Sequence, residues 1–411
     1  MNIFQKIFSI TNEPGVKIIC ILGFTFRFNI RTFFNLKYKN LPIENNKIVF
    51  LNFKGKGFGC NPKYIAQEII RQNLPYKMVW LCKDTSEEAV SNFPSCIKVV
   101  NYKKPEALKE LATAKIWIDN QRKIYHIKKG LNKKAGQYYI QTWHGSLGIK
   151  KIGVDSPLTE IENDWVPYGI EDAKMLDYVL SNSKFEEDVF KRNFWGHGEI
   201  LQVGHPRNDI FYKDTTELKN KLYESLNISK SKHICLYVPS YRDNYGLYCY
   251  GLEYKNLIKI LTQKFGGEWV ILVRMHPNLV KYASQIIPHN ENIIDVSTYS
   301  DIQELLVGSD IAISDYSSCI FDFMLTRRPA FIYATDMEDF DNDRGFYYPL
   351  KSTPFPVAEN NGELMDNIKN FDYSLYKQKV EEFLREKGCM EDGKASERVV
   401  ELIKKIIENK G

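Results

Sequence analysis

Residues 310–333 read DIAISDYSSCIFDFMLTRRPAFIY. Two short apolar runs, 310–314 and 330–333, flank a run with helical spacing at 317–326. A strand, a helix and a second strand in this order are typical of a βαβ unit, which places its two strands parallel in one sheet. The unit also places two serines, Ser317 and Ser318, at the start of its helix.

The same alternation occurs in two series, which a polar stretch at residues 204–214 separates. The first predicts strands at residues 47–53, 77–81, 97–100, 115–119, 138–142, 178–181 and 199–203, and helices that include 62–72, 105–114 and 184–193. The second predicts strands at residues 233–239, 269–275, 293–295, 310–314 and 330–333, helices at 254–264, 302–307 and 317–326, and a helical tail with amphipathic runs at 374–386 and 395–408. We therefore expect an α/β fold with two parallel sheets that face one another, and ligands at the carboxyl ends of their strands.

Charge excludes a dedicated nucleic-acid binder. The chain of 411 residues has 56 basic and 51 acidic residues, a net charge of +5, which is too mild for a dedicated nucleic-acid binder but compatible with polyanionic substrates. Nine bases and one acid, Asp119, lie between Lys115 and Lys151, so this stretch should attract phosphates. We expect no nucleic-acid partner.

The cysteine pattern argues against a metal centre. Eight cysteines are scattered without a C-x-x-C pair or a zinc-finger histidine partner, which is typical of reduced structural thiols. No other group of metal ligands stands out in the sequence. We expect neither a metal nor a bound cofactor.

Residues 1–42 form a segment with an unusual composition. Aromatic and aliphatic side chains alternate there with six bases and a single acid, Glu13. The apolar run from Ile18 to Phe26 is too short to span a bilayer. Two interpretations stay open: a helical segment that lies on a membrane surface, or a pair of helices packed on the first domain.

A histidine follows the predicted strand at 138–142 in the order Thr142-Trp143-His144-Gly145. A side chain at the carboxyl end of a parallel strand is placed for ligand contact, and imidazole can accept a proton from a hydroxyl near neutral pH. His144 is therefore a candidate general base. The alternative is a hydrogen-bonded structural histidine beside Trp143.

Three cationic groups end two strands of the second series. Arg274 and His276 follow the apolar run at 269–273, and Arg242 follows the run at 236–238. Guanidinium and imidazolium groups there can donate to phosphate oxygens and neutralise charge as a phosphoanhydride breaks. The alternative for Arg274 and His276 is a strand end exposed to water.

The serines of the opening stretch suit an anion. Free backbone N–H groups, the helix dipole and the hydroxyls of Ser317 and Ser318 together favour a phosphate, although ordinary N-capping by serine is the alternative. Asp322, one turn later, could bind polyol hydroxyls or be a solvated surface residue. Arg207 lies near the domain junction, where an interdomain hinge is favoured over substrate contact.

Seven motifs, taken in order, resemble the CDP-glycerol glycerophosphotransferase family, whose members build teichoic acids and related capsules. The resemblance spans residues 45–400, and the ordered set is far more specific than any single motif. The motifs are Asn61-Pro62-Lys63-Tyr64-Ile65, Ile140–Gly145, Gly204–Asp209, Pro239–Asp243, Arg274–Pro277, Ser314–Ser318 and Arg344-Gly345-Phe346-Tyr347.

The resemblance implies a GT-B type fold of two Rossmann-like domains around a central cleft. Acceptor groups would lie on residues 43–208 and CDP-donor groups on residues 209–411. It implies that His144 is the catalytic base, that His276, Ser317, Ser318 and Arg242 hold phosphate, and that Asp322 contacts the polyol. The family usually has Thr-Pro where this chain has Ser146-Leu147, and Asp where it has Cys60, which leaves the acceptor and the polyol open.

The expected reaction transfers glycerol phosphate from CDP-glycerol to a hydroxyl of a lipid-linked or growing teichoic-acid or capsular polymer, with release of CMP. The alternatives are transfer from CDP-ribitol, a sugar glycosyltransferase with a nucleotide sugar, and a basic scaffold for anionic polymers. Expected partners are a CDP-polyol donor, a lipid-linked polyol-phosphate or glycan acceptor, and a membrane surface. The resemblance places the enzyme in the cytoplasm, at the inner face of the cell membrane.

Overall fold

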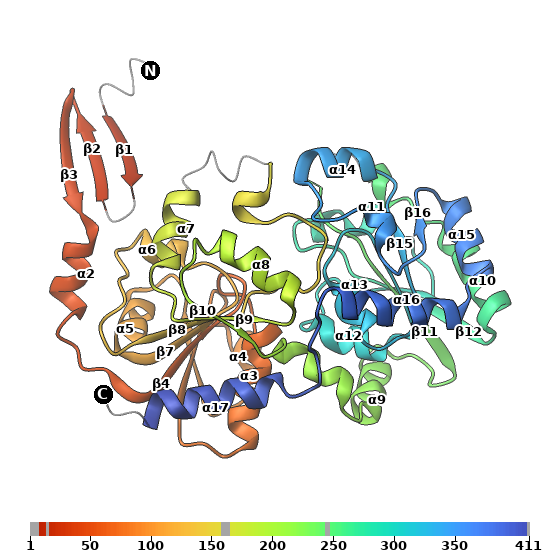
Figure 1. The fold of residues 1–411 in the computed structure, drawn as a ribbon, viewed down its shortest axis with the longest axis horizontal. Coiled ribbons are helices and arrows are strands. Elements are labelled where there is room, and N and C mark those ends of the chain that lie inside the picture. The colour runs from red at the N-terminus through yellow and green to blue at the C-terminus, as the bar shows by residue number, and fades with distance from the viewer. Residues whose placement is uncertain (1–7, 14–15, 158–164, 243–246, 409–411) are drawn as a thin grey trace.

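Two α/β domains lie side by side in the computed structural model, which describes residues 8–13, 16–157, 165–242 and 247–408 (Figure 1). Each domain has its own parallel sheet with helices packed against it. The two-domain α/β architecture predicted from the sequence is thus confirmed. Among the described helices, none is long and apolar enough to cross a bilayer.

The first sheet has seven parallel strands in the order β10-β9-β8-β7-β4-β5-β6. They are β4 (Glu44–Leu51), β5 (Lys77–Cys82), β6 (Ile97–Asn101), β7 (Ala114–Asp119), β8 (Tyr138–Gln141), β9 (Tyr178–Ser181) and β10 (Glu199–Gln202). The helices of this half are α3 (Cys60–Arg71), α4 (Glu87–Ser91), α5 (Pro105–Thr113), α6 (Ile124–Ile127), α7 (Trp165–Ala173) and α8 (Lys184–Asn193). All six residues of β7 are buried, as expected for a central parallel strand covered on both faces.

The second sheet has six parallel strands in the order β13-β12-β11-β14-β15-β16. They are β11 (Lys232–Val238), β12 (Glu268–Val273), β13 (Ile293–Asp295), β14 (Ile311–Ser314), β15 (Ala330–Tyr333) and β16 (Val357–Ala358). The helices are α9 (Thr216–Ser225), α10 (Tyr254–Phe265), α11 (Ala283–Ile286), α12 (Ile302–Gly308), α13 (Cys319–Met324), α14 (Met337–Arg344), α15 (Asn361–Lys369) and α16 (Tyr373–Glu386). The quoted stretch 310–333 forms β14, α13 and β15, as predicted.

The last helix corrects the predicted domain boundary. We expected residues 209–411 to belong to the second domain, but α17 (Ala395–Glu408) returns to the first (Figure 1). Its apolar stripe, which includes Val399, Val400 and Ile403, packs with Ile65 and Ile69 of α3 against the first sheet. An amphipathic helix must bury its apolar face somewhere, and spacing alone does not indicate the partner.

The amino-terminal segment is also corrected, because the helices expected before residue 30 are wrong. Residues 8–29 form an antiparallel sheet of β1 (Phe8–Glu13), β2 (Val16–Ile21) and β3 (Phe24–Asn29), followed by one helix, α2 (Ile30–Tyr38). Leu22 and Gly23 join β2 to β3 with φ of 49° and 85°, both positive as in a type I′ hairpin turn. The expectation for residues 1–7 lies outside the described residues.

Candidate active site

His144 lies just beyond the carboxyl end of β8. Hydrogen bonds there link the residues that follow β8, β7 and β4. The Nδ1 of His144 is 2.6 Å from the carbonyl oxygen of Asn120, which follows β7. The Asn120 side chain accepts a hydrogen bond from Phe53 N at 2.8 Å and donates to Asn52 Oδ1 at 2.8 Å, and both of these residues follow β4. The imidazole is therefore fixed by backbone at the carboxyl edge of the sheet, where a ligand site was expected.

The contact with Asn120 also determines the state of the imidazole. A carbonyl oxygen only accepts, so Nδ1 carries the proton and the lone pair lies on Nε2. Burial lowers the pKa of His144 to about 4, and the nearby charges of Arg207, Lys150 and Lys54 act in the same direction. His144 is therefore neutral at pH 7, with Nε2 able to accept a proton.

The chain after His144 crosses into the second domain. Leu147 and Ile149 are buried in the core of that domain. The Ile149 carbonyl accepts a hydrogen bond from Tyr347 N at 2.8 Å, and Lys151 N donates to the Gly345 carbonyl at 3.0 Å. Both domains thus hold the loop that carries His144, which limits its freedom to move relative to the second domain.

This crossing brings Ser318 against the His144 loop. A Cβ atom on Gly148 would lie 3.1 Å from the Ser318 Cβ, so the close approach favours glycine. Ser317 and Ser318 are partly exposed, and Ser318 precedes α13 without a side-chain capping bond. The hydroxyl of Ser318 therefore does not cap the helix, whereas Ser317 Oγ accepts from Cys319 N at 3.5 Å.

Two cations lie within electrostatic range of Cys319, the first residue of α13. Burial lowers the pKa of Lys150 and of Arg274, and the Cys319 thiol contributes to the pKa of both groups, so both cations lie within electrostatic range of it. Arg274 also donates to the Tyr299 carbonyl at 2.7 Å. His276, exposed after β12, stacks on Tyr241 with ring centroids 5.3 Å apart. Positive charge therefore collects where the two domains meet, as a phosphate site requires.

Arg242 has partners other than the predicted phosphate. Its Nε and Nη2 donate to Asp336 at 2.8 Å each, and its Nη1 donates to the Ser240 carbonyl and to Asp315. The guanidinium is buried between two carboxylates and is not presented as an open phosphate clamp. Asp315 also accepts a hydrogen bond from the backbone N–H of Tyr316, the residue before Ser317 and Ser318. The structure therefore supports a role for Arg242 in positioning the turn that carries the two serines.

Arg207 and Asp322 form a buried ion pair with each other. Arg207 Nε is 2.9 Å from Asp322 Oδ2, Nη2 is 3.2 Å from Oδ1, and Nη2 also donates to the Gly145 carbonyl at 2.9 Å. Asp322 is thus neither a solvated surface residue nor open to a polyol. The pair supports the hinge interpretation of Arg207, because it ties the domain junction to α13 and to the residue after His144.

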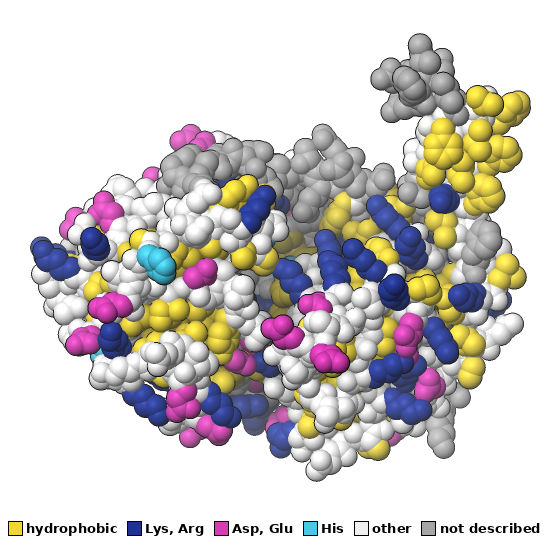
Figure 2. Space-filling view, turned by 180° about the vertical axis from the view of Figure 1, so that it is seen from behind, with side chains coloured by type: hydrophobic (Ala, Val, Ile, Leu, Met, Phe, Trp, Pro, Cys, Tyr) yellow, Lys and Arg dark blue, Asp and Glu magenta, His cyan; other side chains and the backbone are white. Residues whose placement is uncertain are grey.

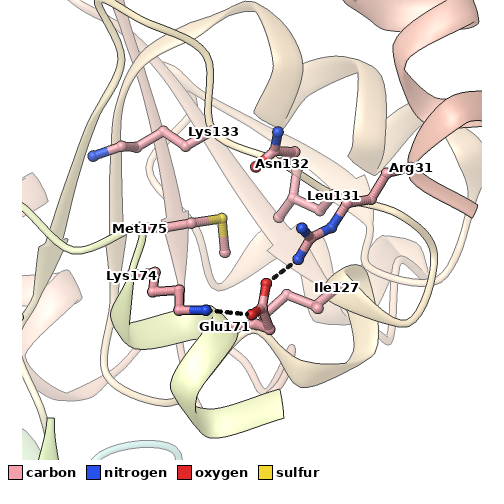
Figure 3. Close-up of a pocket in the computed structure, with 8 residues that line it drawn as sticks. All are labelled: Arg31, Ile127, Leu131, Asn132, Lys133, Glu171, Lys174 and Met175. Atoms are coloured by element: carbon pink, nitrogen blue, oxygen red, sulfur yellow. Dashed lines mark hydrogen bonds and ion pairs between the residues drawn. The ribbon is translucent and has the colours of Figure 1, made fainter. Parts of the chain in front are cut away.

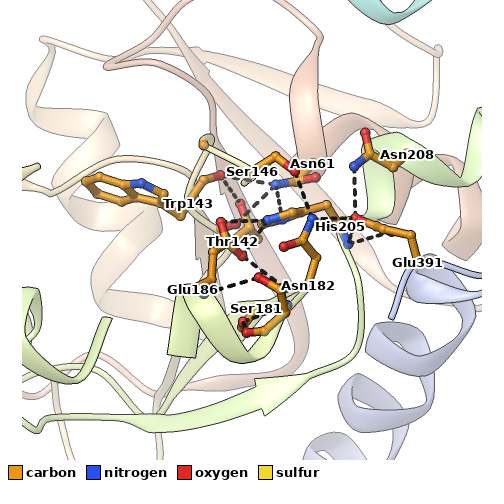
Figure 4. A network of polar contacts seen from close by, with 12 residues as sticks. Asn61, Thr142, Trp143, Ser146, Ser181, Asn182, Glu186, His205, Asn208 and Glu391 are labelled. Carbon is orange, nitrogen blue, oxygen red and sulfur yellow. Dashed lines mark hydrogen bonds and ion pairs between the residues drawn. The ribbon is translucent and has the colours of Figure 1, made fainter. Parts of the chain in front are cut away.

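A second polar network binds the backbone of the loop that carries His144 (Figure 4). Asn61, near the start of α3, donates to the carbonyls of Thr142 and Trp143 at 3.1 Å each, and its Oδ1 accepts from Arg207 N at 3.1 Å. Its Nδ2 also lies 3.3 Å from His205 Nδ1. The motifs at residues 61–65 and 204–209 therefore meet at the backbone that carries His144.

Glu391 closes this network at the domain junction. Its partly buried carboxylate accepts from Asn182 at 2.9 Å and from Asn208 at 2.8 Å (Figure 4). Burial raises the pKa of Glu391 to about 7. Glu391 lies between α16 and α17, in the segment by which the chain returns to the first domain. Its bond with Asn208 links this segment to the one by which the chain leaves the first domain.

Sequence reasoning missed two residues of this site. Lys150 was only counted among the bases of 115–151, although its position two residues after Gly148 brings it to α13. Asn120 belongs to no motif. It contacts His144 through its backbone carbonyl oxygen, which a residue of any type would supply. In the described ranges, no cluster of three or more His, Cys, Asp or Glu side chains could hold a metal ion.

The comparisons with known proteins agree with this geometry. A family model described as CDP-Glycerol:Poly(glycerophosphate) glycerophosphotransferase matches residues 32–405. The chain belongs to this family. The resemblance suggested by the seven motifs is thereby confirmed.

Relatives of this glycerophosphotransferase family member include two bacterial polymerases. It is 30% identical over 394 residues to the teichoic acid poly(glycerol phosphate) polymerase of Staphylococcus epidermidis, covering 92% of this chain and 53% of that protein. It is 32% identical over 377 residues to the protein of the same name from Bacillus spizizenii, covering 88% of this chain and 92% of that protein. The chain thus spans about half the length of the first relative and most of the second.

A solved structure and a more distant relative complete the comparison. The wall teichoic acid polymerase TagF superposes with a TM-score of 0.79 at 28% identity, covering 92% of this chain and 94% of that one, which confirms the predicted GT-B type fold. The teichoic acid ribitol-phosphate polymerase TarL of Staphylococcus aureus is 26% identical over 391 residues, covering 91% of this chain and 64% of that protein.

Proposed function

We propose that this glycerophosphotransferase family member transfers glycerol phosphate from CDP-glycerol to a hydroxyl of a growing teichoic-acid type polymer and releases CMP. The observation that carries the proposal is the state of His144. It is a neutral imidazole whose Nδ1 is held by the Asn120 carbonyl, on a loop that packs against Ser318. Transfer from a nucleotide donor to a hydroxyl requires a general base for the hydroxyl and a site that holds the donor phosphates close to it, here on opposite domains.

In this mechanism, Nε2 of His144 takes the proton of the acceptor hydroxyl. The hydroxyl oxygen attacks the β-phosphorus of CDP-glycerol and forms a new phosphodiester bond. The bond from that phosphorus to the bridging oxygen breaks, and CMP leaves with the electron pair. The diphosphate of the bound donor offsets the positive charges that lower the pKa of His144, so the imidazole becomes a stronger base when the donor is present.

Charge that develops on the leaving phosphate needs donors that are already in place. Lys150 and Arg274 lie within electrostatic range of Cys319 at the start of α13, directly after the partly exposed Ser317 and Ser318. His276, stacked on Tyr241, is a further donor in this proposal. Preorganised cations and hydroxyls of this kind stabilise a phosphoryl-transfer transition state without reorganising during the reaction.

Glycerol is the polyol that we favour. The relatives named for poly(glycerol phosphate) are more similar to this chain than TarL, which is named for ribitol phosphate. The acceptor in this proposal is linked to a lipid, so the enzyme works at the inner face of the cell membrane. The basic stretch at 115–151 would then guide the polyanionic acceptor toward His144.

The test is a product analysis by mass spectrometry with the full chain. CDP-glycerol, CDP-ribitol and UDP-sugars are each offered with a lipid-linked glycerol phosphate acceptor. We expect CMP release and a mass increase of one glycerol phosphate per transfer from CDP-glycerol. The matched histidine variants are His144→Asn, which should abolish turnover, and His289→Asn, an exposed residue before the amino end of β13, which should not.

Other outcomes would replace the proposal. Ribitol phosphate transfer would identify CDP-ribitol as the donor. Release of a nucleoside diphosphate with a sugar-sized mass increase would show attack at carbon, as in a sugar glycosyltransferase. Wild-type turnover by His144→Asn would remove the base from the mechanism.

A further inference from the structure

The sheet of β1, β2 and β3 lies before residue 32, where the match to the family begins. Its strands pair antiparallel, and directly paired residues place their side chains on the same face. Phe26 pairs with Ile19, and Ile19 pairs with Ile10. Following this register through the sheet collects large apolar side chains on one face: Phe8, Ile10, Ile19, Ile21, Phe24, Phe26 and Phe28. Lys17, which pairs with Phe28, lies on the same face at its edge near α2.

This apolar face is open. The side chains of Phe24 and Phe8 are 72% and 56% exposed, and Leu22 at the turn is 70% exposed. Figure 2 shows the hydrophobic side chains gathered on this sheet, which projects from the body of the molecule. The other face carries Thr25 and Arg27 on β3, opposite the partly buried Cys20 and Ile18 of β2. An antiparallel sheet normally buries its apolar face, so a continuous open one marks a contact surface.

Positive charge accompanies the apolar face. Residues 8–39 contain Lys17, Arg27, Arg31, Lys37 and Lys39 but only one acid, Glu13. At the foot of the sheet, Arg31 of α2 pairs with Glu171 of α7, which fastens the segment to the first domain.

The same ion pair borders a small pocket between α2 and α7. The pocket has a volume of about 200 Å³, and three cations and one carboxylate line it (Figure 3). Arg31 and Lys174 pair with Glu171, and Lys133 pairs with Asp177. The apolar sheet thus stands beside cations at its base, on the outer side of the first domain and away from the second (Figure 1).

We propose that β1–β3 form a membrane anchor whose apolar face inserts into an anionic bilayer while the exposed bases Lys17, Lys37 and Lys39 contact headgroup phosphates. This deepens the membrane location proposed above and rests on it. Charge complementarity favours the bilayer over a second copy of the chain. A two-fold dimer of this face would bring the same bases toward one another, whereas anionic headgroups neutralise them.

The experiment is sedimentation of the full chain with vesicles of phosphatidylcholine alone or mixed with phosphatidylglycerol. We expect binding only to the mixed vesicles, weaker in high salt. Phe26→Asp should lower binding by about tenfold or more, because it places a charge in the apolar face. The matched control is Thr25→Asp, which adds the same charge on the opposite face and should bind nearly as wild type.

A second variant guards against misfolding of the sheet. Leu22→Asp removes the apolar tip, yet aspartate suits the positive φ of that turn position, so the hairpin is retained. It too should lose vesicle binding. CMP release with a short-chain acceptor should be unchanged in all three variants, which separates failure of the anchor from failure of the proposed reaction.

Two results would overturn the anchor. One is vesicle binding by Phe26→Asp and Leu22→Asp equal to that of wild type. The other is a wild-type dimer, detected by analytical ultracentrifugation without lipid, that Phe26→Asp converts to a monomer while Thr25→Asp does not. That pattern would assign the face to a second copy of the chain.

Discussion

Replacing Asp322 by leucine removes the carboxylate that pairs with the buried Arg207 guanidinium. The two side chains are only 3% and 4% exposed, and Arg207 Nε lies 2.9 Å from Asp322 Oδ2. With charge centres about 4 Å apart and an effective dielectric constant of about 20, the lost attraction is about 4 kcal/mol. This agrees with the roughly 3–5 kcal/mol that breaking one side of a buried ion pair costs.

The assay is urea denaturation of wild type, Asp322→Leu, Arg207→Met and the double variant. Each single variant should lower the free energy of unfolding by several kcal/mol, whereas the double variant should recover much of the loss, because no charge is then left unpaired. The affinity for CDP-glycerol of the folded Asp322→Leu protein should change little. Wild-type stability together with a large loss of donor affinity would refute the ion-pair role and favour the polyol contact that the sequence suggested.

Three further predictions concern the reaction. His144→Ala should lower kcat by about a hundredfold to ten-thousandfold with nearly unchanged donor affinity in calorimetry, because the base acts on the acceptor proton; normal kcat would exclude it. Since the pKa of His144 is lowered from 6.5 to about 4, the free enzyme should keep its base unprotonated as pH falls through 6.5, and kcat/KM should decline only toward the lower value; a decline centred at 6.5 would contradict the buried environment. Lys150→Met and Ser318→Leu should each weaken CDP-glycerol binding by about tenfold, and unchanged affinity in both would place the donor phosphate elsewhere.

Most of the sheet strands could be predicted because parallel strands covered on both faces are continuous apolar runs. The bounds of β9, β13 and β15 agree with the predicted residue ranges. β16 has only two residues and carries no pattern of its own. The helical structure expected within residues 1–42 is wrong for residues 8–29, because short apolar runs do not distinguish a strand from a helix when no core is known.

The sequence by itself determined the alternation of strands and helices, and with it the edge of each sheet at which His144, Arg274 and the serines lie. It did not determine what those side chains contact. Arg242 and Asp322 each carry a charge that the sequence leaves free for a ligand, but both are paired inside the protein with residues about 70 to more than 100 positions away. Only tertiary structure decides such pairs, because a buried charge must find a partner wherever the packed chain provides one. The place of Lys150 in the site likewise depends on tertiary structure, because backbone pairing between residues 149–151 and 345–347 brings it there.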